Sequence, residues 1–87
     1  MDILVRKPTD SEIEVMKSKP IWTCGVSEFD WFYDATETCL IIEGEVIVKY
    51  GGSKSVTIAE GDYVVFPCGL SCVWDVKKPI KKYYEFL

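Results

Sequence analysis

The segment from Gly61 to Cys72 constrains the fold of this chain more than any other part of it. Its sequence, GDYVVFPCGLSC, contains a short run of β-favouring side chains. Pro67 ends that run, because proline has no N–H to donate to a sheet. Gly69 can adopt the positive φ that a tight turn needs. The segment therefore predicts a buried strand, a proline–glycine corner and a further strand that begins near Cys72.

Short apolar runs separated by turn residues continue through the rest of the chain from Ile21 onward. Around Phe29, Trp31 and Tyr33 the side chains alternate with the period of two that a strand produces, and Gly51-Gly52 is typical of a hairpin. The predicted strands are residues 21–26, 28–34, 38–42, 46–50, 54–59, 63–66, 71–76 and 80–86. Many short strands of this kind indicate an all-β sandwich or barrel.

One short helix is predicted before the strands. Thr9-Asp-Ser-Glu12 has the spacing of a capping box, and Lys19-Pro20 ends the helical pattern. We expect a helix over about residues 10–17 that packs on the sheet and carries no chemistry.

Size and charge exclude several classes of protein. A chain of 87 residues makes one domain, residues 1–87, and its net charge of −4 argues against binding to nucleic acid. The one basic cluster, Lys77, Lys78, Lys81 and Lys82, is interpreted as a solvated edge. No apolar stretch has the length of a membrane span and no signal peptide is visible, so we expect a cytoplasmic protein with reduced thiols and no membrane partner.

The chain contains no histidine. This absence excludes a Ser–His–Asp triad, a Cys–His dyad and any metal centre held by imidazole.

Two motifs in the sequence resemble the two signatures of the cupin superfamily. The first is Glu37, six residues and Gly44, and the second is Gly61, five residues, Pro67, one residue, Gly69, two residues and then Cys72 in a slot that usually holds histidine. With their flanks, the motifs cover about residues 31–44 and 61–76. The chain is most similar to small single-domain cupins grouped with the (S)-ureidoglycine aminohydrolase cupin domain. This resemblance implies an antiparallel double-sheet jelly roll that forms a small β-barrel.

The resemblance also implies where a metal would bind, and the residues at those positions are unusual for that role. The positions of the cupin metal ligands fall on Trp31, Tyr33, Glu37 and Cys72, and Tyr83 stands where relatives often carry a histidine. Of these, only Glu37 keeps the usual type of ligand. A tyrosine and a lone cysteine without imidazole are a poor set for zinc, manganese or iron. We therefore expect no bound metal and no other cofactor.

The alternation of side chains along each strand predicts which of these residues face the interior. Glu37 shares a face with Cys39, Trp31 with Tyr33, and Cys72 with Trp74. The candidate ligand-binding residues are Trp31, Tyr33, Glu37, Cys39, Cys72, Trp74 and Tyr83. Burial among aromatic side chains raises the pKa of a carboxyl group, so Glu37 is also the candidate catalytic acid or base.

Three functions remain open from the sequence. The first is a metal-free module that binds a small polar or planar metabolite inside the barrel. The second is an enzyme of the ureidoglycine aminohydrolase or isomerase type that uses Glu37. The third is a structural dimer with a filled barrel. We expect a homodimer in any case, with residues 21–26, Leu40 and Ile42 as candidate contacts.

Overall fold

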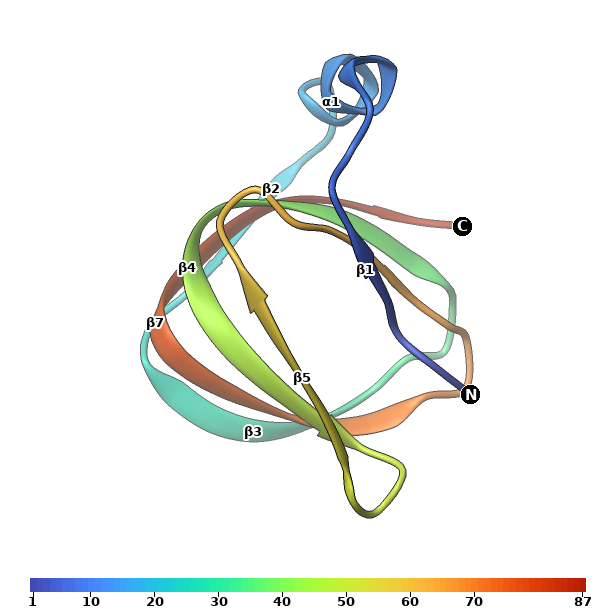
Figure 1. Ribbon diagram of the computed structural model, residues 1–87, viewed down its shortest axis with the longest axis vertical. Helices are drawn as coiled ribbons and strands as arrows, with labels where there is room; N and C mark the ends of the chain where they lie inside the picture. The colour runs from blue at the N-terminus through green and yellow to red at the C-terminus, as the bar shows by residue number, and fades with distance from the viewer.

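The computed structural model describes all residues from 1 to 87, and it shows an all-β protein with one short helix (Figure 1). Its elements in chain order are β1 (Leu4–Arg6), α1 (Asp10–Met16), β2 (Ile21–Cys24), β3 (Ser27–Phe32), β4 (Glu37–Tyr50), β5 (Lys54–Ala59), β6 (Tyr63–Phe66) and β7 (Ser71–Phe86). The predicted fold class, a small antiparallel all-β protein with one short helix, is confirmed.

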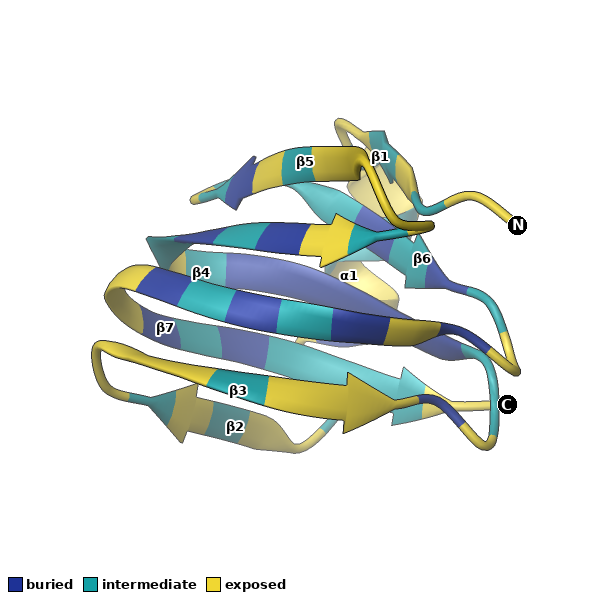
Figure 2. Cartoon of the chain, turned by 90° about the horizontal axis from the view of Figure 1, so that it is seen from below, coloured by how far each residue is buried: buried dark blue, intermediate teal, exposed yellow.

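The two long strands, β4 and β7, organise the sheet. They pair with each other antiparallel along most of their length. The first half of β4 also pairs with β6, and β6 in turn pairs with β1. The second half of β7 pairs with β2. The second half of β4 pairs with β5, and the first half of β7 pairs with β3. The sheet thus has two arms that share two strands, and it curls around a common interior (Figures 1 and 2).

The long strands bend where the register between them shifts, between Ile41 and Val46. Gly44 lies in this stretch with a φ of 100°, a conformation that favours glycine. A Cβ atom at this position would overlap the carbonyl group of Pro79 in β7. Register shifts of this kind curve a sheet, so the close approach at Gly44 helps to turn one arm toward the other.

The sequence predicts that strands end at residues 43–45 and 78–79, and this prediction is wrong. β4 and β7 each run on through them as one bent strand. Pro79 is tolerated because it lies in the irregular stretch, where β4 pairs with Lys78 and Lys81 but not with Pro79 itself. The strands predicted at residues 54–59 and 63–66 are confirmed with the same bounds. β1 was not predicted, since three residues are too few to show a period.

The helix begins and ends as its signals predict. The hydroxyl of Thr9 accepts a hydrogen bond from the backbone N–H of Glu12, and the Glu12 carboxylate accepts one from the backbone N–H of Thr9. α1 ends at Met16, the one helical residue that is buried. It packs against β4. No helix in the molecule is both long and apolar enough to cross a membrane.

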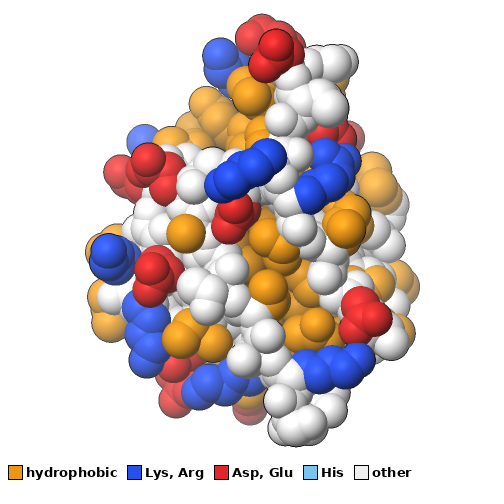
Figure 3. All heavy atoms as spheres, in the orientation of Figure 1, with side chains coloured by type: hydrophobic (Ala, Val, Ile, Leu, Met, Phe, Trp, Pro, Cys, Tyr) orange, Lys and Arg blue, Asp and Glu red, His pale blue; other side chains and the backbone are white.

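Thirteen of the 18 buried residues form one hydrophobic cluster between the two arms. Burial alternates along β6 and the first half of β7, as Figure 2 shows by the alternating bands. The predicted interior face of β7 is confirmed, because Cys72, Trp74 and Val76 are all buried. On the face drawn in Figure 3, acidic and basic side chains are interspersed rather than gathered by sign.

Candidate functional site

A pocket with mainly aromatic walls opens into the interior of the sheet. Its volume is about 190 Å³. The residues that line it come from β2, β3, β4 and β7 and from the loop after β3, and they are Trp22, Phe29, Trp31, Tyr33, Glu37, Trp74, Lys82, Tyr84 and Phe86. All three tryptophans of the chain are among them.

The topology explains why these side chains meet. β7 contributes residues from both of its halves, and β3 and β2 pair with those two halves in turn. Phe29 lies opposite Trp74 in the β3–β7 pair, and Trp22 lies opposite Lys82 in the β2–β7 pair. Glu37 enters from the start of β4, where it pairs with Phe86. The pocket is therefore assembled along one strand and its neighbours.

The aromatic wall is built around Trp74. The ring of Trp22 meets it edge-on with 5.8 Å between centroids, and the ring of Phe29 is stacked on it at 6.1 Å. Trp31 and Tyr33 form a second edge-to-face pair at 6.3 Å. Trp74 is almost fully buried, whereas Trp31 is about half exposed (48%). Trp74 thus lies deep in the pocket and Trp31 lies at its mouth.

A buried ion pair supplies the polar end of the pocket. Lys82 Nζ lies 2.8 Å from Glu37 Oε2, and the two side chains are only 5% and 3% exposed. The ammonium group also lies over the rings of Trp22 and Trp74, at 4.9 Å and 4.7 Å from their centroids. Cation–π contact and the carboxylate together compensate the ammonium for the water it has lost.

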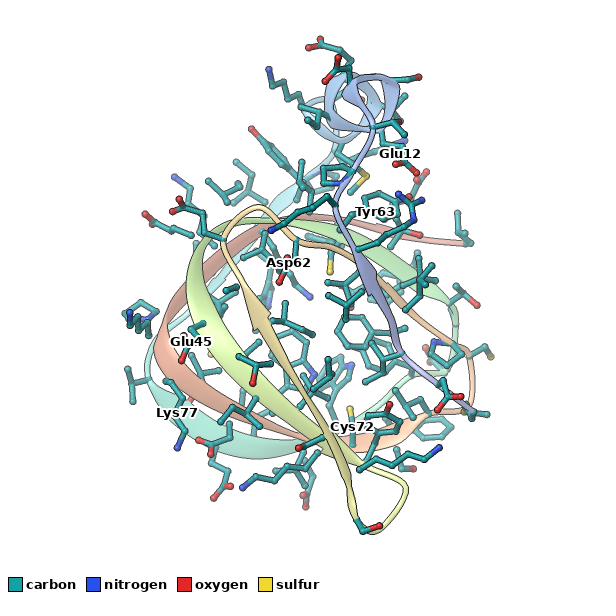
Figure 4. All side chains as sticks on the ribbon, in the orientation of Figure 1. Glu12, Glu45, Asp62, Tyr63, Cys72 and Lys77 are labelled. Atoms are coloured by element: carbon teal, nitrogen blue, oxygen red, sulfur yellow. The ribbon has the colours of Figure 1, made fainter.

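Sequence reasoning found Glu37 but missed its partner. Lys82 was assigned with Lys77, Lys78 and Lys81 to a solvated edge, and for Lys82 this interpretation is wrong. Lys77 and Lys78 are exposed, and Figure 4 shows Lys77 outside the ring of strands. A signal was present: Ile80, Lys82 and Tyr84 alternate within a predicted strand, so a buried Ile80 places Lys82 on the interior face.

Tyr33 lies beside the ion pair as a neutral phenol. Its burial, and secondarily the nearby Glu37 carboxylate, raise the pKa of the hydroxyl far above its ordinary value. Its ring is stacked on Phe66 with 4.8 Å between centroids. Tyr33 can therefore offer a hydrogen bond to a ligand but no charge.

The predicted site residues do not all come together. Trp31, Tyr33, Glu37 and Trp74 line the pocket. Cys39 is fully buried in the core beneath it and does not line it.

Cys72 and Tyr83, the other two predicted site residues, lie outside the pocket. Cys72, which is labelled in Figure 4, lies in the same interior but faces a separate, open groove. Its thiol is directed at the Trp31 carbonyl, 3.7 Å away. Tyr83 follows Lys82 on the opposite face of β7, and its neighbour Tyr84 lines the pocket instead.

The buried thiols should be chemically inert. Burial raises the pKa of Cys39 to about 12 and that of Cys72 to about 11, and thiolate is the reactive form. Cys68 is exposed. With a disulfide reagent at pH 8, we expect Cys68 to react first and Cys39 and Cys72 to react about a hundredfold more slowly until the protein is unfolded. Mass spectrometry of partly labelled protein checks this order, and early labelling of Cys72 would contradict the burial described here.

The residues at the cupin metal positions do not fit a metal ion. The indole of Trp31 has no lone pair to donate, and the Glu37 carboxylate is already paired with the Lys82 ammonium, which would repel a cation. Cys72 faces away toward a backbone carbonyl. Nowhere in the chain do three or more side chains of metal-binding type come together. The positive charge in this pocket is therefore the ammonium group of Lys82.

Comparison with known proteins gives one family and a set of similar structures. Residues 12–84 match the family described as the EutQ-like cupin domain. The crystal structure of a DUF861 family protein from Thermotoga maritima is 42% identical and superposes with a TM-score of 0.94, covering 99% of this chain and 100% of that one.

More distant structures share the fold over part of their length. The putative ethanolamine utilization protein Q of Salmonella typhimurium is 21% identical with a TM-score of 0.69, and the EutQ protein of Clostridium difficile is 20% identical with the same score. Each match covers 76% of this chain but only 53% and 52% of those proteins, so the chain spans about half of their length. No curated protein matches the sequence at a significant level.

Proposed function

This chain belongs to the EutQ-like cupin domain family, DUF861, and from that premise we propose that it binds a small planar metabolite in the aromatic pocket without the help of a metal ion. One observation carries the proposal: the pocket combines stacking surfaces with a buried Glu37–Lys82 pair at one end. A mainly apolar cavity with a few convergent polar groups is the usual form of a small-molecule site.

The size of the pocket limits the ligand. An engineered apolar cavity of roughly 150 Å³ is large enough to bind benzene. The volume of about 190 Å³ found here therefore suits one ring with small substituents. Most of the lining side chains are aromatic, and aromatic rings favour contact with a flat ligand.

A second function, catalysis of the ureidoglycine aminohydrolase or isomerase type, is favoured by one observation only. Glu37 and Lys82 lie within hydrogen-bond distance in the pocket, and a carboxylate beside an ammonium can exchange a proton with a bound substrate. If a ligand is turned over, Glu37→Gln abolishes turnover while a pocket ligand still binds. If no product forms from any bound ligand, the binding function stands alone.

The proposed binding is tested at the mouth of the pocket. We expect Trp31→Ala to weaken the binding of a planar ring compound by about 2- to 12-fold, the range that loss of one aromatic contact implies. Phe32→Ala is the matched control, because Phe32 is the next residue on β3, is also exposed, and does not line the pocket. Calorimetric titration of both variants checks this expectation. Equal effects from the two substitutions would count against the pocket as the binding site.

The expected homodimer is also a proposal. β2 pairs on only one side, with β7, and it leaves Ile21 about half exposed, while Val26 just after it is more exposed still. An unpaired strand edge with exposed apolar side chains is a surface on which a second copy can dock. Leu40 cannot serve as a contact because it is already buried within one chain. We expect sedimentation at micromolar concentration to show a dimer that Ile21→Lys dissociates, and a 9.9 kDa species at all concentrations would refute it.

A further inference from the structure

The hydrogen-bonding groups of the pocket have unused capacity. An ammonium group has three donors and a carboxylate has about four acceptor sites. The bond between Lys82 and Glu37 uses one of each, and the neighbouring Tyr33 hydroxyl takes at most one more site on the carboxylate. The aromatic rings around Lys82 attract its charge but are not conventional hydrogen-bond acceptors. Both a donor and an acceptor therefore remain available, side by side, at one end of a buried cavity.

The charges at that end cancel. Glu37 carries the negative charge and Lys82 the positive charge, 2.8 Å apart, and no third charged side chain lines the pocket. A ligand with a net charge would meet one group that attracts it and another that repels it. It would also lose its own water without gaining a free counter-charge, which is costly in a buried site. The pair therefore disfavours both anions and cations.

A neutral ligand can use both groups only if it carries a donor and an acceptor next to each other. Resting on the proposed function, we propose that the pocket selects a neutral, planar, single-ring lactam or related heterocycle whose adjacent N–H and C=O face Glu37 and Lys82. The N–H donates to the carboxylate and the C=O accepts from the ammonium. The ring itself lies among the aromatic side chains that line the cavity.

Five small probes of similar size separate this proposal from simple binding. They are 2-pyridone, which has the adjacent donor and acceptor, its N-methyl derivative, which lacks the donor, benzene, which lacks both, and the ions benzoate and benzylammonium. We expect 2-pyridone to bind at least about tenfold more tightly than each of the others, because a site with buried polar groups penalises a ligand that leaves them unpaired. Calorimetry and protein NMR measure the five affinities.

The outcomes distinguish the proposed selectivity of the pocket from the proposed binding function itself. If benzene or an ion binds in the pocket as tightly as 2-pyridone, the selection proposed here is overturned while the binding function stands. If none of the five binds, the binding function fails, and this inference fails with it.

Variants of the ion pair test the cause of the selection. Glu37→Gln removes the negative charge, and we expect the preference to shift by at least about tenfold toward benzoate. Should that variant fail to fold, the double variant Glu37→Leu with Lys82→Met makes the same test in an uncharged pocket. It should still bind benzene but lose the preference for 2-pyridone. If the preference survives in the double variant, the ion pair is not its source and the proposal is overturned.

Discussion

Gly44→Ala is expected to lower the free energy of unfolding by more than about 4 kcal/mol, or to prevent folding altogether. Two causes act together. The φ of 100° at Gly44 is unfavourable for any residue with a Cβ atom, and that Cβ atom would overlap the carbonyl of Pro79. Neither the backbone of β4 nor that of β7 can move away without breaking the pairing between the two long strands.

Two other glycines separate these causes. Gly52 has a positive φ of 80° but open space around it, so Gly52→Ala should cost only about 1–2 kcal/mol. Gly25 has neither feature, and Gly25→Ala should change stability by less than about 0.5 kcal/mol. Urea unfolding followed by circular dichroism measures all three. If Gly44→Ala costs no more than Gly52→Ala, the close approach of β4 and β7 does not constrain the fold.

Lys82→Met is expected to lower the free energy of unfolding by about 3–5 kcal/mol. The substitution keeps most of the side-chain volume but leaves the Glu37 carboxylate buried without its partner. Denaturant unfolding of the unsubstituted protein and of the variant at pH 7 measures the size of this effect, and a loss of less than about 1 kcal/mol would contradict it.

The double variant Glu37→Leu with Lys82→Met is the control for this prediction. Replacing a whole buried ion pair by apolar residues of similar volume is often neutral or stabilising. We expect the double variant to be at least about 3 kcal/mol more stable than Lys82→Met alone. A double variant that is as unstable as the single one would show that packing around Lys82, rather than its charge, is what matters.

The fold could be predicted from the sequence because its signals are local. The capping box at Thr9, the strand at residues 54–59 and the Pro67–Gly69 corner each depend on neighbouring residues, and the structure contains all three elements. The bend of β4 and β7 could not be predicted in the same way. In the sequence, Gly44 and Pro79 each look like the end of a strand. Only their contact across the sheet shows that both lie in one bend of two paired strands.

The site was predicted in part for a related reason. Glu37, Trp31, Tyr33 and Trp74 were assigned to the interior from alternation along their own strands, and they line the pocket. The burial of Lys82 is hard to predict because Lys77, Lys78 and Lys81 lie beside it in the sequence, and a cluster of lysines is typical of a solvated edge. Phe29 and Trp22 were not selected because their role depends on which strands lie beside β7, and the sequence does not specify this pairing.

The continuity of β7 has a consequence for how ligands are discriminated. Trp74 and Lys82 stand on the same strand, on either side of Pro79. The position of Lys82 relative to Trp74 is thus set by main-chain curvature and not by a mobile loop. The size of ring that the cavity accepts would then be set by the rigid backbone of the scaffold. Substitutions near Pro79 would therefore change which ring sizes bind, although Pro79 does not line the cavity.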